Sequence, residues 1–135
     1  GAELAMLQNH AGRSPLESMD AVATADQVMA AIAVVRRVYV SDDVHRYAIA
    51  LVTATRTSND LRLGASPRAT LQLIRASKAA AALDGRDYVV PDDVRALAVP
   101  VLAHRLLPTA EAQIARRTPE VVVERIVEST PVPGS

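Results

Sequence analysis

The residue types that most often carry catalysis or bind metals are scattered through this sequence. Its three histidines, His10, His45 and His104, stand far apart, and none has a second ligand-type residue at a metal-binding spacing. The sequence has no cysteine, which excludes disulfides, thiolate metal sites and a cysteine nucleophile. It also has no glycine-rich phosphate loop. We therefore expect no metal site, no tightly bound cofactor and no catalysis by this chain alone.

Two pairs of adjacent acids, Asp42-Asp43 and Asp92-Asp93, could in principle serve metal binding or acid–base chemistry. Neighbouring residues on a helix point about 100° apart, so the two carboxylates of a pair do not converge. Each pair also follows a helix-start signal, Ser41 in one case and Pro91 in the other. Acids in a first turn stabilise the helix dipole. We therefore interpret both pairs as helix starts.

Arg68 is the remaining candidate for binding chemistry. Ser66 and Pro67 predict an N-cap and a first helical residue, which places Arg68 in the first turn of a helix. A cation is disfavoured there by the helix dipole, whereas the free backbone N–H groups attract anions. A forked guanidinium beside those amides would suit a phosphate group. The alternative is a solvated surface arginine, and the residues alone leave both interpretations open.

The distribution of charge supports an anion site more than the net charge does. Fifteen basic and fifteen acidic residues balance, but residues 56–78 hold five basic residues against Asp60 alone. A nucleic-acid-binding domain usually has net positive charge, and one that binds single strands stacks aromatic rings on the bases. This chain has zero net charge and only three aromatic residues, all tyrosine, so we expect no nucleic-acid partner. With neither a secretory signal nor an apolar run long enough for a membrane span, we expect a cytoplasmic protein without membrane insertion.

Helical periodicity dominates the elements that must position these residues, and alanine is abundant. A first helix begins after a capping box of Thr24 and Gln27 and puts Val28, Ile32 and Val35 on one face. The predicted long helices cover residues 25 to about 37, 42 to about 57, 67–83, 91–99 and 119 to about 128, and the second of them buries Val44, Ala48, Leu51 and Val52. We also expect a short helix at 3–8, a linker at 11–23, a turn at 58–60 and a disordered tail at 131–135.

Two extended fragments, Tyr39-Val40 and Tyr88-Val89, each lead into a predicted helix. They are either independent helix entries that use the same residue types or two segments that lie side by side. The predicted fold class is all-α, a small helical bundle with at most a minimal two-stranded element formed by these two fragments.

Three motifs give a family resemblance. The run from Leu61 to Ala69, Leu-Arg-Leu-Gly-Ala-Ser-Pro-Arg-Ala, is similar to the sensor 2 motif of MoxR-type AAA+ ATPases. The run from Leu83 to Val94 and the triplet His104-Arg105-Leu106 resemble the same family in order and spacing. The resemblance covers about residues 25–130, and Glu3 to His10 resembles the segment that leaves the ATPase core. It is weakest from Leu107 to Arg117, and Val90 stands where the family often has threonine.

The resemblance implies an AAA+ lid at residues 25–130, preceded at 1–24 by the end of the ATPase core and a linker. It places Arg68, as the sensor 2 arginine, near the γ-phosphate of ATP, with Ser66 capping the helix at the same site. The Walker A and Walker B motifs belong to the core, so the parent protein would bind ATP with Mg and hydrolyse it, whereas this fragment would be inactive. The expected partners are the chain's own ATPase core and the neighbouring subunits of a homo-oligomeric, chaperone-like ring. The resemblance gives Arg105 no role and does not decide whether Arg68 acts on its own subunit's ATP.

Two other functions remain open. The chain could be a helical protein–protein interaction module that docks a partner through an exposed apolar groove, with Arg68 incidental. A helical nucleic-acid binder that uses residues 56–78 is the weakest alternative, because the net charge is zero.

Overall fold

The structure is a computed structural model that describes residues 2–3 and 19–134. Contacts divide the chain into two units, residues 1–32 and residues 33–135. Most of the short helix expected at 3–8, and the linker as far as residue 18, lie outside the described residues. The second unit contains every buried residue discussed below.

Helix α2 (Ala25–Arg36) begins with the predicted capping box. The Gln27 amide donates to Thr24 Oγ1 at 3.1 Å, and the Thr24 amide donates to Gln27 Oε1 at 2.9 Å. None of its residues is buried, and the side chains of Val28 and Ile32 remain 48% and 41% exposed. The predicted apolar face therefore exists as a pattern but is not part of the core.

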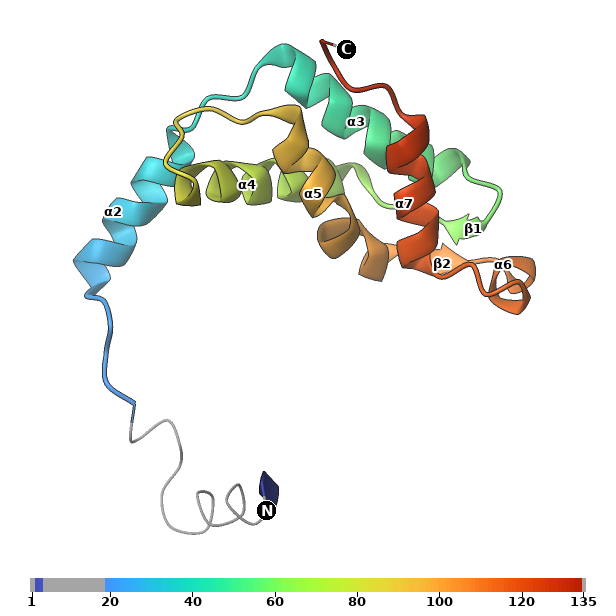
Figure 1. Cartoon of the computed structure of the whole chain (residues 1–135), viewed down its shortest axis with the longest axis horizontal. Helices are drawn as coiled ribbons and strands as arrows, with labels where there is room; N and C mark the ends of the chain where they lie inside the picture. The colour runs from blue at the N-terminus through green and yellow to red at the C-terminus, as the bar shows by residue number, and fades with distance from the viewer. Residues whose placement is uncertain (1, 4–18, 135) are drawn as a thin grey trace. The chain divides into compact units, whose positions relative to one another are not determined.

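Four helices build the folded part of the second unit: α3 (Asp42–Thr57), α4 (Pro67–Leu83), α5 (Pro91–Leu102) and α7 (Pro119–Ser129) (Figure 1). Helix α5 packs against each of the other three, and α3 also packs against α4 and α7. The stripe predicted for α3 is buried, and aliphatic side chains make up almost the whole core. The largest fully buried apolar side chains are Leu51, Leu73, Leu102, Val52, Val94, Val122 and Val123.

The two extended fragments lie side by side. Tyr39 and Tyr88 form a parallel bridge in which the Tyr39 amide donates to the Asp87 carbonyl at 2.8 Å. The Val89 amide donates to the Tyr39 carbonyl at 2.9 Å. This confirms the second of the two interpretations, although the pairing is an isolated bridge.

The two-stranded sheet of the described residues comes from other segments than those expected. Strand β1 (Leu61–Leu63) pairs antiparallel with β2 (Leu107–Pro108), Leu61 opposite Pro108 and Leu63 opposite Leu107, with an irregularity between the two pairs. Figure 1 shows this sheet at the end of the bundle where α6 (Ala110–Ile114) lies. A strand of two or three residues carries too little alternation to be recognised in a sequence.

Two further expectations need correction. Helix α5 does not end before Pro100 but continues to Leu102, followed by a 3₁₀ turn, η2 (Ala103–Arg105). The proline deprives the helix of one hydrogen bond, to the carbonyl of Ala96, and Ala96 is exposed so that water can replace it. The second concerns the first residues of the tail at 131–135, because Val132 is partly buried and packs against the core; disorder of the tail as a whole stays a prediction.

The all-α class is confirmed: the described residues form six α-helices and one two-stranded sheet. No helix in the described ranges is both long and apolar enough to span a membrane.

Candidate functional site at the start of helix α4

Arg68 lies where the sequence predicts it, in the first turn of α4, and its side chain is exposed. No hydrogen bond or ion pair from its guanidinium group exists within the described part of the chain. A cation at this end of a helix opposes the dipole and gains no compensating contact. Arg68 is therefore free to meet an anion from outside the chain.

Ser66 occupies the N-cap position of α4 with extended backbone angles (φ −75°, ψ 164°). Its hydroxyl, however, makes no capping hydrogen bond, so the expected side-chain cap is not formed. The caps of other helices do form: the hydroxyls of Ser41, Thr109 and Thr118 accept from the amides of Val44, Ala112 and Val121. At the start of α4 the Ala69 amide donates to the Ser66 carbonyl at 2.9 Å instead, so the Ser66 hydroxyl is not used by the helix.

The loop before α4 is fixed to the end of α3. The Ala65 amide donates to Thr55 Oγ1 at 2.9 Å, and Thr55, itself buried, donates to the Val52 carbonyl at 2.6 Å. Arg56 Nε donates to the Ala65 carbonyl at 2.9 Å. A Cβ atom on Gly64 would lie 2.5 Å from the Thr55 carbonyl oxygen, so only glycine allows this approach of the two backbones. The Gly-Ala-Ser-Pro-Arg string therefore has a mechanical role in placing Arg68.

A pocket of about 520 Å³ lies beside this loop and has three arginines on its wall. Arg56 and Arg105 each use Nε on a backbone carbonyl, those of Ala65 and Val101. Arg62 is exposed and has no hydrogen-bond partner within the described residues. The lining contains no acid, and Arg68 is not part of it. The complete lining is Arg56, Arg62, Leu63, Gly64, Ala65, Ser66, Pro67 and Arg105.

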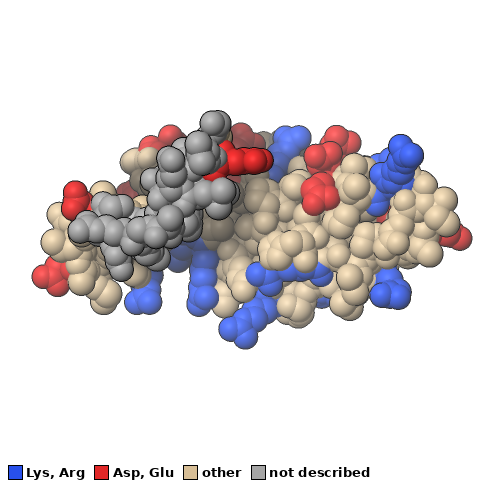
Figure 2. Space-filling view, turned by 90° about the horizontal axis from the view of Figure 1, so that it is seen from below, with Lys and Arg blue, Asp and Glu red and all other residues tan. Residues whose placement is uncertain are grey.

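Sequence analysis did not bring these three arginines together. Arg56 and Arg62 fall within the positive stretch 56–78, which indicated a concentration of basic residues. The stretch did not indicate that these side chains line the same pocket. Arg105 belongs to a family motif without an assigned role, and it reaches the pocket from η2, about 40 residues further along the chain. Figure 2 shows Lys and Arg side chains along the lower edge of the face in view, with no Asp or Glu between them.

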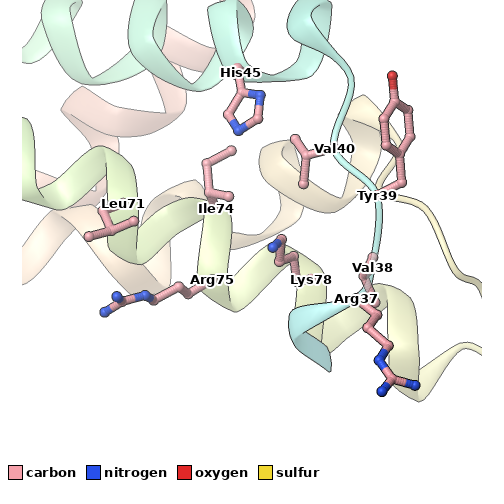
Figure 3. Close-up of a pocket in the computed structure, with 9 residues that line it drawn as sticks. All are labelled: Arg37, Val38, Tyr39, Val40, His45, Leu71, Ile74, Arg75 and Lys78. Carbon is pink, nitrogen blue, oxygen red and sulfur yellow. The ribbon is translucent and has the colours of Figure 1, made fainter. Parts of the chain in front are cut away.

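A second pocket, of about 460 Å³, lies between the segment 37–40 and helices α3 and α4. In Figure 3, Val40 and Ile74 lie at its centre with the His45 ring above them, whereas the guanidinium groups of Arg37 and Arg75 extend outward at its edge. Lys78 Nζ donates to the Arg36 carbonyl at 3.3 Å. The lining residues of α4 that share a face with Arg68 are Leu71, Arg75 and Lys78.

The acid pairs have structural roles, as the sequence indicated. The Asp93 carboxylate accepts the Val90 amide at 2.8 Å at the start of α5, and the Asp93 amide, which a threonine hydroxyl at residue 90 would accept, donates to the Val90 carbonyl at 3.0 Å. The carboxylate also accepts two hydrogen bonds from Arg86, at 2.9 and 2.7 Å, and these hold the pKa of the Asp93 carboxyl below its usual value. No group of three or more histidine and acidic residues suited to a metal ion occurs in the part of the chain described.

Comparison with known proteins identifies the family to which this chain belongs. The family of AAA lid domains matches residues 53–126, more than half of the chain and the whole of the arginine-lined pocket. The chain belongs to the AAA lid domain family, of the MoxR type. It is 38% identical to the chaperone MoxR1 of Mycobacterium tuberculosis over 64% of this chain and 26% of that protein. It is 40% identical to the protein MoxR of Methylorubrum extorquens over 52% of this chain and 21% of that one.

Two further comparisons extend over nearly the full chain. An uncharacterised protein of Bacillus subtilis, YeaC, is 32% identical over 97% of this chain and 41% of its own length. The crystal structure of a protein from Cytophaga hutchinsonii provisionally named an ATPase superimposes with a TM-score of 0.80 at 26% identity. The match covers 97% of this chain and 42% of that structure. The chain thus spans about two fifths of the length of these two proteins.

Proposed function

We propose that this lid acts as the nucleotide sensor of a MoxR-type AAA+ ATPase, with Arg68 as the sensor 2 residue that contacts the γ-phosphate of ATP. The observation that carries the proposal is Arg68 itself, an exposed arginine without a partner in the first turn of α4. Ser66 contributes a hydroxyl at the helix start that makes no hydrogen bond to a helix amide and could contact the same phosphate. The match to the AAA lid family over residues 53–126 supports the same role.

The chemistry of the site suits coupling rather than bond cleavage. A guanidinium–phosphate contact contributes about 1.5–3 kcal/mol and exists only while the terminal phosphate is present. The lid orientation that permits the contact is therefore favoured with ATP and loses that advantage after hydrolysis. The loop that precedes Arg68 is fixed to α3 through hydrogen bonds with Thr55 and Arg56. A displacement of Arg68 would therefore be transmitted to the helical bundle.

The parent protein would supply the remaining parts. We propose that a nucleotide-binding core of the same polypeptide holds ATP with Mg and hydrolyses it, and that the subunits form a homo-oligomeric ring with chaperone-like activity in the cytoplasm. The name of the relative from M. tuberculosis, a chaperone, supports the chaperone-like activity, and the provisional name of the structure from C. hutchinsonii supports ATP hydrolysis by the parent protein.

The test is ATP turnover by the assembled parent protein at saturating ATP. Arg68→Ala should lower turnover by a factor of about 10 to 100, which corresponds to the loss of one charge-assisted contact. Arg68→Lys should restore only part of it, because lysine keeps the charge but not the planar fork.

Arg75→Ala is the matched control, because Arg75 lies on the same face of α4, also exposed, about two turns further along. It should change turnover little, since the attraction of a helix start for anions fades after the first turn. If Arg68→Ala turns over ATP at the wild-type rate, Arg68 is a solvated surface residue and the proposal is wrong.

One observation favours a second candidate, a protein–protein interaction module without a nucleotide role. The pocket in Figure 3 has an aliphatic floor that includes Val38, Val40 and Ile74 and could receive an apolar side chain of a partner. Under this alternative, Ile74→Ala would abolish partner binding while Arg68→Ala left both binding and turnover unchanged.

A further inference from the structure

Three arginines from separate parts of the lid line the pocket beside α4, and none of them forms an ion pair with a described residue. Arg56 comes from the end of α3, Arg62 from β1 and Arg105 from η2. The four ion pairs of the described residues involve other arginines, and the nearby carboxylate of Asp60 is already held by Arg117 at 2.9 Å. Three like charges around one pocket repel each other, and a ligand of opposite charge would relieve that repulsion.

Two of the three guanidinium groups are oriented in advance. Arg56 Nε is bound to the Ala65 carbonyl at 2.9 Å, and Arg105 Nε to the Val101 carbonyl at 3.2 Å. These bonds leave the terminal Nη groups of both side chains without partners. An arginine held in this way loses less rotamer entropy when it binds a ligand.

We infer that this pocket binds the phosphate groups of a nucleoside polyphosphate through Arg56, Arg62 and Arg105. This deepens the proposed function, and rests on it for the source of the phosphates, because Ser66 and Pro67 line the pocket immediately before Arg68. The inference gives Arg105 the role of an anion-binding residue. The pocket of about 520 Å³ lies within the range of small-ligand sites.

The charge and the lining favour phosphates over a carboxylate side chain of a protein partner. A single carboxylate offers one negative charge to three guanidinium groups, whereas a polyphosphate offers several charges and many acceptor oxygens. Only Leu63, Ala65 and Pro67 give the lining apolar side chains, and no aromatic residue is present to anchor a peptide.

Binding of inorganic tripolyphosphate to this chain, measured by isothermal titration calorimetry at low salt, tests the inference. Arg105→Gln and Arg62→Gln should each weaken binding at least tenfold. Arg125→Gln is the control: it removes the same charge from an exposed position on α7, and should weaken binding less than twofold. Arg62→Gln guards against misfolding, because the Arg62 side chain is exposed and forms no ion pair with any other residue that the structure describes.

Citrate at the same concentration separates the two ligand chemistries, because it carries comparable charge on carboxylates. It should bind at least tenfold more weakly than tripolyphosphate. Equal binding of citrate, absence of tripolyphosphate binding by the wild type, or an equal effect of Arg125→Gln would each overturn the inference.

An Arg68→Gln chain separates this inference from the proposed function. If it alone loses binding while Arg62→Gln and Arg105→Gln bind normally, the pocket fails and the sensor 2 role stands. If the pocket variants lose binding while Arg68→Ala in the parent turns over ATP normally, the sensor 2 role fails and the pocket stands.

Discussion

At the scale of single residues, two serines in the same position of two helices behave differently. The Ser41 hydroxyl at the start of α3 accepts the Val44 amide at 3.2 Å, whereas the Ser66 hydroxyl at the start of α4 accepts from no helix amide. The corresponding amide of α4, that of Ala69, donates to the Ser66 carbonyl at 2.9 Å instead. Both have the extended backbone angles of an N-cap. The hydroxyl of Ser66 is therefore available to something other than its own helix.

This difference predicts unequal effects of the same substitution. Ser41→Ala should lower the free energy of unfolding by about 1 kcal/mol, because a formed cap is lost. Ser66→Ala should change it by no more than about 0.5 kcal/mol, as for an ordinary surface position. Urea unfolding of the two variants and the wild type measures both. An equal loss in the two variants would mean that Ser66 caps α4 after all.

At the scale of elements, the contact between the end of α3 and the loop before α4 positions the site. Thr55→Val keeps the shape of the side chain but removes the acceptor of the Ala65 amide, which would then be buried without a partner. The expected loss is about 1–3 kcal/mol of unfolding free energy, with faster hydrogen exchange at Ala65. Thr57→Val is the control, since Thr57 is exposed. Unchanged exchange at Ala65 would show that Thr55 does not anchor the loop.

The start of α5 should contribute a stability that depends on pH. The pKa of Asp93 is lowered in the folded state by its hydrogen bonds with Arg86, so the pair stabilises the fold above the unfolded pKa of about 3.9. That stability is lost as the pH falls through the folded pKa of Asp93. Asp93→Asn should therefore lower the urea midpoint at pH 7 and much less at pH 3.

Asp84→Asn is the comparison, because Asp84 also pairs with Arg86 but its side chain is 70% exposed. It should shift the midpoint less than Asp93→Asn at pH 7. A loss in Asp93→Asn that is the same at both pH values would mean that the carboxylate charge is not what stabilises α5.

The helices could be predicted from the sequence because their signals are local. Ser66-Pro67 marks the first residue of α4, and the spacing of Val44, Ala48 and Leu51 marks the buried face of α3. The pairing of β1 with β2 could not be predicted, since it joins segments more than 40 residues apart through two or three residues each. Pro100 misled the prediction because a proline in the last turn of a helix removes only one hydrogen bond.

The candidate site divides in the same way. Arg68 could be placed because its position depends on the residues just before it. Arg105 could not, because it joins Arg56 and Arg62 only through the packing of η2 beside the loop. The sequence motif thus predicted the position of Arg68, whereas only the folded structure shows that Arg56, Arg62 and Arg105 line one pocket beside it.

At the scale of the whole molecule, the proposed function gives the lid the role of supplying charge and orientation rather than the groups that break a phosphate bond. Its sequence has no glycine-rich phosphate loop with a Lys-Ser or Lys-Thr pair. The arginines of the pocket beside α4 can stabilise negative charge, and the lining of that pocket contains no acid or histidine that could activate a water molecule.

The chain by itself should therefore release phosphate from ATP no faster than the buffer blank does. The measurement is phosphate release over several hours at saturating ATP with Mg, on a homogeneous sample whose helical circular dichroism spectrum shows that it is folded. The Arg68→Ala chain serves as the control, because contaminating ATPases do not depend on Arg68. Release by the wild type that disappears in this variant would place catalysis within the lid and contradict its assignment as a sensor. A phosphate-sensing lid should bind tripolyphosphate without turning over ATP, and the Arg105→Gln substitution should weaken that binding.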